Sequence, residues 1–338
     1  MTTTTAHDVA PDTAPDAAHD APAQPGAASG AEHSARLPQL DGVLVLNKPS
    51  GPTSARCVAA IKRLGQKKIG HAGTLDPLAS GVLLVLLGQA TKLSGHLQGD
   101  GGKVYSGTLR LGQTTDTWDS EGTVTAEAAW EHVREEDVRR EIAAWRDLTE
   151  QPVPPYSAAK HRGQPLYKLA RKGIAAPAKV KRIQILQAET LIVSLPLVRF
   201  RVACSSGTYI RSLAHSLGMR LGCGAVLTEL TREYSHPFGL DAACDLAAFT
   251  ADPGLLPAAV RPIAEALPGW RKVELTPEEA ARVRNGVAVP CRKPESPADG
   301  AEDAACALLL EQGDALALAR REATPAGPCW TVVRGLWN

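Results

Sequence analysis

A single carboxylate inside a glycine-rich segment is the group best placed to do chemistry. Between Lys68 and Val85 the chain reads KIGHAGTLDPLASGVLLV, and Asp76 is the only acidic residue of this stretch. Glycines let the backbone approach a ligand closely, and the apolar run that follows would hold the carboxylate on a rigid strand. The same Leu-Asp-Pro could instead begin a helix, with Asp76 as its cap and Pro77 at the first helical position. Both interpretations of Asp76 are open at this point.

Basic residues gather in a stretch that has no carboxylate, between Glu150 and Glu189. Its cations are Lys160, Arg162, Lys168, Arg171, Lys172, Lys179, Lys181 and Arg182. A second group precedes the glycine-rich segment and consists of Lys62, Arg63, Lys67 and Lys68. Two such patches could follow a polyanionic backbone, although a solvated basic surface has the same composition. The net charge of +1 does not decide between them.

Two other sets of residues have side chains of the kinds that bind metal ions. Asp116, Asp119 and Glu121 bring three carboxylates close together in sequence, but their spacing does not match a calcium-binding loop. We interpret them as a polar turn. The seven cysteines are scattered and include no C-x-x-C pair, which argues against a zinc site and against a disulfide framework. The sequence therefore predicts no metal site.

The elements that must position these residues mix strands with single helices. We expect strands at 42–48, 82–88, 103–112, 180–195 (one long strand or a bent pair) and 198–207. Helices are expected at 54–64, 88–97, 135–148 and from about Thr208, and residues 67–80 are expected to form a loop. This order favours an α+β fold with a mixed, largely antiparallel central sheet over a doubly wound parallel sheet.

Composition divides the chain into three parts. Residues 1–38 are rich in Ala, Asp, Thr, Pro and Gly without apolar periodicity, so we expect a disordered tail. Residues 39–250 would form the main domain, and residues 268–338 a small β-rich module after an Ala- and Pro-rich connector. No apolar run is long enough to span a bilayer, and the first residues do not read as a secretory signal. These features predict a cytoplasmic protein, with a monomer as the default.

Several segments resemble, in the same order, those of the bacterial tRNA pseudouridine synthase B (TruB) family. GHAGTLDPLASGVLLV is similar to its catalytic motif, and the other matching segments are LNKPSGPTS, KVYSGTLRLGQTTDTWDSEG, PPYSAAKHRGQPLYKLARKG and SSGTYIRSLAHSLGMRLGCGAVLTELTR. The similarity covers roughly Asp41 to Tyr234, and the C-terminal module is similar in a general way to the RNA-binding PUA domain of that family. The resemblance implies a sheet of the pseudouridine synthase type. It also implies a stand-alone enzyme that converts uridine 55 in the tRNA T-arm to pseudouridine without a cofactor or a guide RNA.

The resemblance also implies roles for single residues of the catalytic pocket. Asp76 matches the essential aspartate, and Arg211 matches the arginine that pairs with it. Tyr105 matches the active-site tyrosine, which would take the C5 proton or stack on uracil. Tyr209 would lie in the pocket beside the arginine, and Leu230 would pack against the base. Taken alone, Arg211 could form a surface ion pair and Tyr209 could be an ordinary core residue.

Further matches concern the RNA. His71 resembles the histidine that supports the flipped-out base, although a local hydrogen bond would equally explain a histidine in a glycine loop. Arg232 remains as a phosphate contact, whereas Thr231 stands where many members have an additional arginine. The cations expected to bind T-arm phosphates are Lys160, Arg162, Lys168, Arg171 and Lys172.

Two alternative functions stay open. A tRNA-binding folding chaperone with secondary or no catalytic activity would use the same basic surface. Hydrolysis by a serine nucleophile at Ser205 or Ser206 is less favoured, because the sequence has no G-x-S-x-G elbow.

Overall fold

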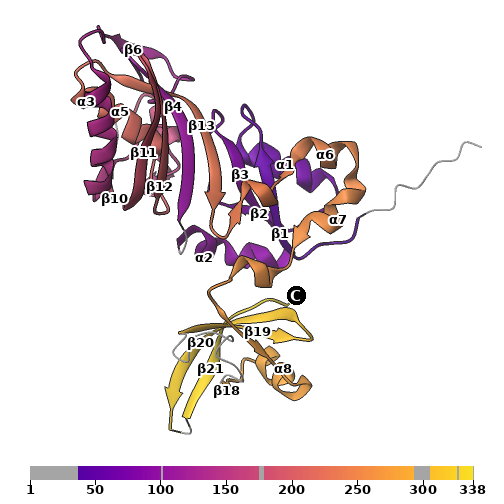
Figure 1. Ribbon diagram of the computed structural model, residues 1–338. Helices are drawn as coiled ribbons and strands as arrows, with labels where there is room; N and C mark the ends of the chain where they lie inside the picture. The colour runs from indigo at the N-terminus through magenta and orange to yellow at the C-terminus, as the bar shows by residue number, and fades with distance from the viewer. Residues whose placement is uncertain (1–36, 100–101, 175–178, 293–304, 326, 338) are drawn as a thin grey trace, which may run out of the picture. The chain divides into compact units, whose positions relative to one another are not determined.

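The computed structural model describes residues 37–99, 102–174, 179–292, 305–325 and 327–337 (Figure 1). Nearly all of the predicted tail, residues 1–36, lies outside this range. The predicted α+β class is confirmed by a large mixed sheet, helices packed on it, and a second sheet in the C-terminal part of the chain.

The main path of the large sheet contains seven strands. Their order is β11 (Ile185–Ser194), β12 (Leu197–Cys204), β4 (Lys103–Leu111), β13 (Ala225–Ser235), β3 (Ser80–Leu87), β1 (Gly42–Lys48) and β15 (Cys244–Asp245). Neighbours pair antiparallel except at β13 with β3 and at β1 with β15. The strands paired outside this path are β2 (Ile69–Ala72), β14 (Phe238–Gly239) and β16 (Val260–Arg261). The sheet is therefore mixed and largely antiparallel, as predicted.

Both faces of the central strands are buried. In β1, Leu44 and Leu46 join one apolar cluster, whereas Val43 and Val45 join another on the opposite face. Strand β3 alternates in the same way, which explains why its sequence is a continuous apolar run rather than an alternating pattern. Helices α1 (Ser54–Arg63), α3 (Glu135–Ala143) and α5 (Ile210–Arg220) contribute residues to the first cluster.

The structure tests whether Asp76 begins a helix, which was one of the two interpretations of this residue. No helix begins at Asp76; its carbonyl accepts a hydrogen bond from the amide of Ala79, and the chain enters β3 at Ser80. The expected loop at 67–80 also contains strand β2, whose short IGHA sequence gives no strand pattern. The helix-cap interpretation is therefore wrong, and Asp76 lies in a turn between two paired strands.

Other predicted elements are divided in the structure. The predicted helix at 88–97 is a 3-10 helix η1 (Gly88–Leu93) followed by α2 (Ser94–Gly99), and α3 is followed by η2 (Ala144–Asp147). The stretch 180–195 is the bent pair, β10 (Val180–Arg182) and β11, with β10 paired to β7 (Glu150–Pro152). Strand β10 leaves the large sheet because its partner is β7.

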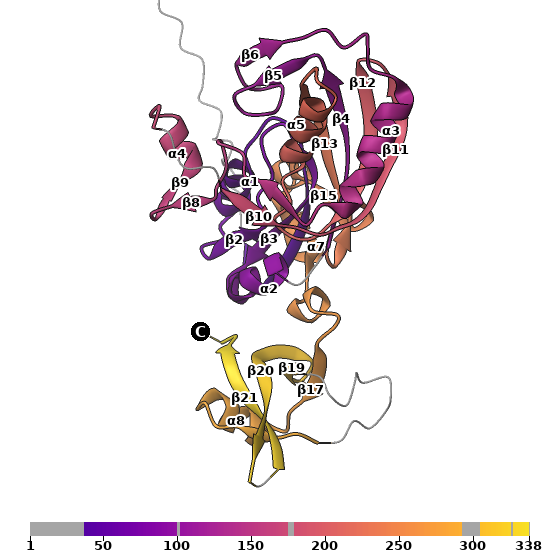
Figure 2. The same ribbon diagram turned by 90° about the vertical axis from the view of Figure 1, so that its left-hand side faces the viewer.

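Between β7 and β10 the chain forms a small projection (Figure 2). It contains β8 (Lys160–His161), β9 (Gln164–Pro165) and α4 (Leu166–Ala170). A separate hairpin of β5 (Gln113–Thr115) and β6 (Val124–Glu127) follows β4. The turn of this hairpin and the beginning of the projection both reach the site described below.

The C-terminal part has its own sheet and apolar cluster. The sheet order is β17 (Arg271–Glu274), β19 (Cys306–Glu311), β20 (Asp314–Thr324), β21 (Gly327–Gly335) and β18 (Val289–Pro290). Helix α8 (Pro277–Arg284) begins with a capping box of Thr276 and Glu279, and its Ala280 and Val283 join Trp330 in the cluster. The short elements that precede β17 in the chain are η3 (Leu240–Ala242), α6 (Leu246–Ala251), η4 (Pro253–Leu255), α7 (Leu256–Ala259) and η5 (Ile263–Ala266). Among all described helices, none has the length and apolar character needed to cross a membrane.

Candidate active site

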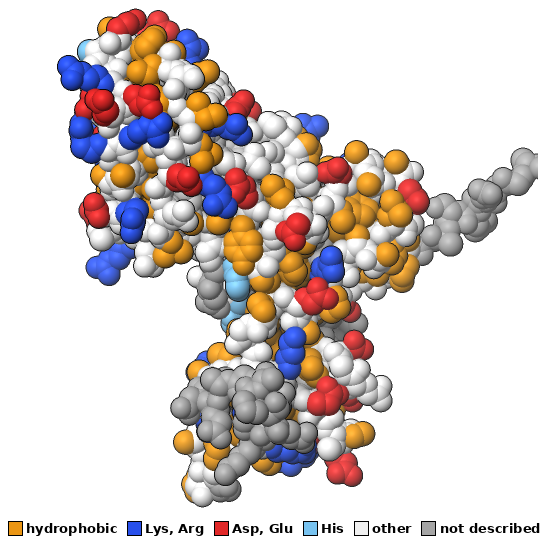
Figure 3. Space-filling view, viewed as in Figure 1, with side chains coloured by type: hydrophobic (Ala, Val, Ile, Leu, Met, Phe, Trp, Pro, Cys, Tyr) orange, Lys and Arg blue, Asp and Glu red, His pale blue; other side chains and the backbone are white. Residues whose placement is uncertain are grey.

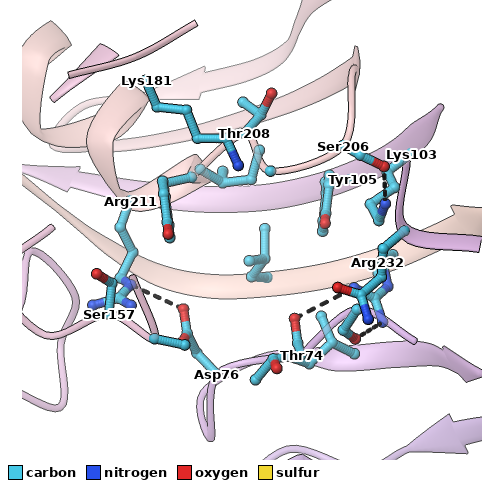
Figure 4. Close-up of a pocket in the computed structure, with 18 residues that line it drawn as sticks. Thr74, Asp76, Lys103, Tyr105, Ser157, Lys181, Ser206, Thr208, Arg211 and Arg232 are labelled. Carbon is cyan, nitrogen blue, oxygen red and sulfur yellow. Dashed lines mark hydrogen bonds and ion pairs between the residues drawn. The ribbon is translucent and has the colours of Figure 1, made fainter. Parts of the chain in front are cut away.

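Asp76 lies in a pocket of about 300 Å³ at the centre of the large sheet (Figure 4). Its turn is fixed from two directions. The fully buried Lys48 ammonium donates to the carbonyls of Pro49, Pro77 and Ala79 at 2.9, 3.3 and 2.5 Å. The Ser54 hydroxyl exchanges hydrogen bonds with the backbone of Leu75 at 2.9 and 3.0 Å. The Asp76 side chain, 39% exposed, is therefore presented to the pocket from a fixed backbone.

Arg211 holds the Asp76 carboxylate from the first turn of α5. Its Nε donates to Asp76 Oδ2 at 2.9 Å, while Nη1 and Nη2 donate to the carbonyls of Thr117 and Tyr156 at 2.8 and 2.9 Å. The Arg211 side chain is only 5% exposed, so this is no surface ion pair. The guanidinium therefore fixes the position of the Asp76 carboxylate at the pocket wall.

Asp119 is a second carboxylate on the same arginine. Its Oδ2 lies 3.5 Å from Arg211 Nε, and its Oδ1 accepts from the Thr117 hydroxyl at 2.6 Å and the Glu121 amide at 3.1 Å. Burial raises the pKa of Asp119, and these hydrogen bonds and Arg211 act in the opposite direction. The sequence interpretation of a polar turn missed this role, because Arg211 follows Asp119 by more than ninety residues.

The remaining pocket residues expected from the resemblance also line the cavity. Tyr105 on β4 and Leu230 on β13 are buried, and Tyr209 precedes α5. The amide of Tyr209 donates to Gln151 Oε1 at 2.5 Å and its carbonyl accepts from Gln151 Nε2 at 3.1 Å, which fixes the beginning of the helix. Burial raises the pKa of the Tyr105 and Tyr209 hydroxyls. The structure thus places Tyr105, Tyr209, Arg211 and Leu230 around Asp76.

Arg232 is buried beside the turn that contains Asp76. It is 1% exposed, and its guanidinium donates to the carbonyls of Val82, Gly73 and Thr74 at 2.7, 2.9 and 3.5 Å. At Gly81 a Cβ would lie 2.3 Å from the Arg232 carbonyl oxygen, at a φ of +99°, so only glycine allows β3 and β13 to approach this closely. Arg232 thus fixes the turn that contains Asp76 and also lines the pocket, while its expected contact with RNA stays a prediction.

Replacing Arg232 with methionine is expected to lower the free energy of unfolding by about 2–4 kcal/mol, because three carbonyls lose a buried donor. Urea denaturation measures this change. Arg110→Met, at an exposed position of β4, is the control and should change stability by less than about 0.5 kcal/mol. An equally small change for Arg232→Met would show that the guanidinium does not hold the turn.

His71 lies on β2 and not in a glycine loop. It is partly buried, is absent from the residues that line the pocket, and its Nδ1 is a buried nitrogen without a hydrogen-bond partner in the described part of the chain. Burial, and secondarily the nearby Arg232, lower the pKa of the imidazole. The ring is therefore favoured in its neutral form, and the structure does not bring it into contact with Asp76.

The five cations expected to bind phosphate all lie on the projection between β7 and β10. Lys160, Arg162, Lys168, Arg171 and Lys172 are exposed. No ion pair joins them to any described carboxylate, whereas the face over α3 in Figure 3 intersperses both signs of charge, with Arg139 paired to Glu135. The same segment contributes Ser157 and Ala158 to the pocket wall, and Lys181 on β10 follows it. The basic surface is thus continuous in sequence with the site.

The serine nucleophile expected as a weak alternative finds no support in this arrangement. The Ser205 hydroxyl accepts from the Gln184 amide at 2.9 Å, and the Ser206 hydroxyl accepts from Lys103 Nζ at 2.5 Å. None of the described residues that line the pocket is a histidine. Sequence reasoning also missed Lys103 and Ser157, which no motif singles out; the only signal was their place within segments that resemble a known family.

Comparison with known proteins identifies the family of the chain. Residues 62–210 match the family model described as TruB family pseudouridylate synthase (N terminal domain). The chain is 61% identical over 302 residues to tRNA pseudouridine synthase B of Nitratidesulfovibrio vulgaris (strain Miyazaki F), covering 89% of this chain and 98% of that protein. It is 62% identical over 305 residues to tRNA pseudouridine synthase B of Oleidesulfovibrio alaskensis, covering 90% and 99%.

Solved structures show the same fold at lower identity. A chain in "Structure of H/ACA RNP bound to a substrate RNA containing 2'-deoxyuridine" aligns with a TM-score of 0.61 and 26% identity, covering 88% of this chain and 85% of that one. A chain in "Crystal Structure of a Cbf5-Nop10-Gar1 Complex" gives the same values. The level of identity to the curated relatives decides the assignment. The chain belongs to the tRNA pseudouridine synthase B family, and it is an isomerase that forms pseudouridine in tRNA.

Proposed function

We propose that the enzyme converts uridine 55 of the tRNA T-arm to pseudouridine, with Asp76 as its essential carboxylate. The observation that carries the proposal is the contact of Asp76 with a buried arginine that is itself fixed by Asp119 and two carbonyls. An ionised carboxylate at the wall of an enclosed pocket can attack a sugar or base atom, or remove a ribose proton.

The reaction exchanges one bond to the ribose for another. The bond from N1 of uracil to C1′ breaks, the base turns, and C5 is joined to C1′ while its proton leaves. Tyr105 and Leu230 form apolar walls on which uracil can pack while it turns. The buried Tyr105 hydroxyl has a raised pKa and so remains protonated, which favours stacking for this residue over service as a resting-state base.

The target base must leave the RNA stack to reach this pocket. Asp76 lies at a pocket wall formed by buried side chains, which a stacked base cannot enter, so flipping is required at a cost of a few kcal/mol. His71 is our candidate for the residue that supports the flipped-out conformation.

The T-arm would be held by the basic projection and by the C-terminal module. The cations of the projection are exposed, and the chain that carries them continues into the pocket wall at Ser157. We propose that the residues from 39 to 250 form the catalytic domain and residues 268–338 a PUA-like RNA-binding module. We further propose that the enzyme acts in the cytoplasm as a monomer without a guide RNA.

The experiment is to map pseudouridine in an unmodified tRNA transcript after incubation with the enzyme. The matched substrate has cytidine in place of uridine 55. A single pseudouridine at position 55 in the first tRNA and none in the second supports the proposal. Modification at other positions in both would contradict the assigned position, and binding with accelerated tRNA folding but no pseudouridine would favour the chaperone alternative.

Neutralising two cations of the projection should weaken tRNA binding mainly at low salt. For Lys168→Gln with Lys172→Gln, the slope of log Kd against log salt concentration should become shallower by about 1 to 2, because fewer counterions are released on binding. Filter binding over a salt series measures this slope. Arg139→Gln on α3 removes a cation that is paired with Glu135 and should leave the slope unchanged. An unchanged slope in the double variant would contradict the placement of the RNA.

A further inference from the structure

A buried lysine lies across the pocket from Asp76. Lys103 begins β4 and is 6% exposed, with its side chain on the same face of the strand as that of Tyr105, two residues later. Its Nζ donates to the Ser206 hydroxyl at 2.5 Å. Figure 4 shows Asp76 with Arg211 at one end of the pocket and Lys103 with Ser206 at the other. The two ends of the pocket therefore carry different kinds of charged group.

Among the described residues, the hydrogen-bonding capacity of Lys103 is not used up. Lysine has three donors, and within these residues Lys103 donates to Ser206. Lys48, also buried, donates to three carbonyls. The guanidiniums of Arg211 and Arg232 are likewise occupied by carbonyl and carboxylate oxygens. Lys103 thus offers donors that a bound molecule can use.

The charges around Lys103 do not compensate its own charge. Burial, together with the like charges of Arg232 and Lys181, lowers its pKa to about 8. Within the described ranges no carboxylate forms an ion pair with it. The amine is still mostly protonated at neutral pH. A buried ammonium without a counter-ion, inside a ligand pocket, is placed to meet negative charge that a substrate brings or develops.

The isomerisation develops such a charge on the base. When the N1–C1′ bond breaks, its electron pair stays with uracil, and the resulting anion spreads its charge over N1 and the two carbonyl oxygens. This holds whether Asp76 bonds to C1′ or removes a ribose proton. The later bond from C5 to C1′ uses an electron pair of that anion, as the bond between Asp76 and C1′ breaks or the abstracted ribose proton returns. C5 then loses a proton and N1 gains one, so that the product is an isomer of the substrate. Preorganised donors aimed at developing charge are among the strongest contributions to catalysis.

We propose that Lys103 is a catalytic residue that donates a hydrogen bond to a carbonyl oxygen of the departing uracil and so stabilises its anion. The role rests on the proposed function, because it concerns the base whose bond Asp76 helps to break. The positions agree with this division: Asp76 and Arg211 at one end of the pocket serve the ribose, and Lys103 at the other end serves the base. Tyr105 and Leu230 lie in the same cavity as its apolar walls.

The test measures the parent enzyme and one variant on each of two substrates. Single-turnover conversion is measured for the parent and Lys103→Met, using T-arm stem-loops with uridine or 5-fluorouridine at the target position. RNA is digested, and loss of the N-linked nucleoside is followed by chromatography with mass spectrometry. Fluorine stabilises the uracil anion, so its departure needs less help from the enzyme. We expect Lys103→Met to slow uridine by about 100-fold and 5-fluorouridine by less than about 10-fold.

The ratio of the two rates is independent of how much of the variant is folded, because both substrates meet the same preparation. Lys181→Met is the matched control: Lys181 also lines the pocket but is only half-buried, so its loss should affect both substrates equally. Equal slowing of both substrates by Lys103→Met, or no slowing, would overturn the role; equal slowing with a raised Kd would identify a phosphate contact instead. If the parent converts neither substrate, the proposed function itself fails, and the role of Lys103 with it.

Discussion

Asp76→Asn is expected to reduce turnover by at least about a thousandfold while tRNA affinity stays within about threefold of the parent. The substitution keeps the shape of the side chain and removes its charge and its basicity. The turn that presents residue 76 is held by Lys48 and Ser54 through backbone atoms, so its conformation does not depend on the carboxylate. Single-turnover conversion and filter binding measure the two quantities.

Asp137→Asn is the control for this substitution. Asp137 is a surface carboxylate on α3 that also pairs with an arginine, Arg140. Its loss should leave turnover unchanged, which separates the effect of position from that of removing any paired carboxylate. Residual turnover of Asp76→Asn within tenfold of the parent would remove this residue from the chemistry.

Arg211→Met is expected to lower turnover by about 100- to 1000-fold and also to destabilise the protein. The substitution leaves Asp76 without its cation and the buried Asp119 without its compensating charge. It also removes the donors that join α5 to the carbonyls of Thr117 and Tyr156. Arg211→Lys should recover little activity, because an ammonium cannot reproduce a planar guanidinium that serves these acceptors together.

A double variant separates the two effects of Arg211. Adding Asp119→Asn to Arg211→Met removes the uncompensated buried charge, so the melting temperature should rise above that of Arg211→Met while turnover stays low. Arg220→Met on the same helix removes a surface pair with Glu141 and should change neither quantity appreciably. Recovery of turnover in the double variant would show that Arg211 matters only for folding.

Local patterns predicted much of the large sheet. Strands β1, β3, β4 and β12 are apolar or alternating runs bounded by glycine or proline, and the structure confirms them within a few residues. Strand β2 escaped prediction because four residues with two small side chains have no period to read, and pairing with β3 alone makes them a strand. Long-range pairing, and not local preference, determines such elements.

The site was predicted only in part, for a related reason. Resemblance identified Asp76, Tyr105, Tyr209, Arg211 and Leu230, and the structure gathers these residues in one pocket. The resemblance could not show that Arg232 is buried, because its burial depends on the parallel contact between β3 and β13. Asp119 was taken for part of a polar turn, since its partner Arg211 lies far along the chain. Residue types predicted the chemistry, and tertiary contacts assigned the supporting roles.

The most direct test of the account is tritium release from C5-labelled uridine at the target position of a T-arm stem-loop. Joining C5 to the ribose expels the C5 hydrogen, so release reports the isomerisation itself and not binding. The account predicts release by the parent enzyme and none above background by Asp76→Asn. Release by neither protein would contradict the assigned substrate position, and release by both would contradict the central role of Asp76.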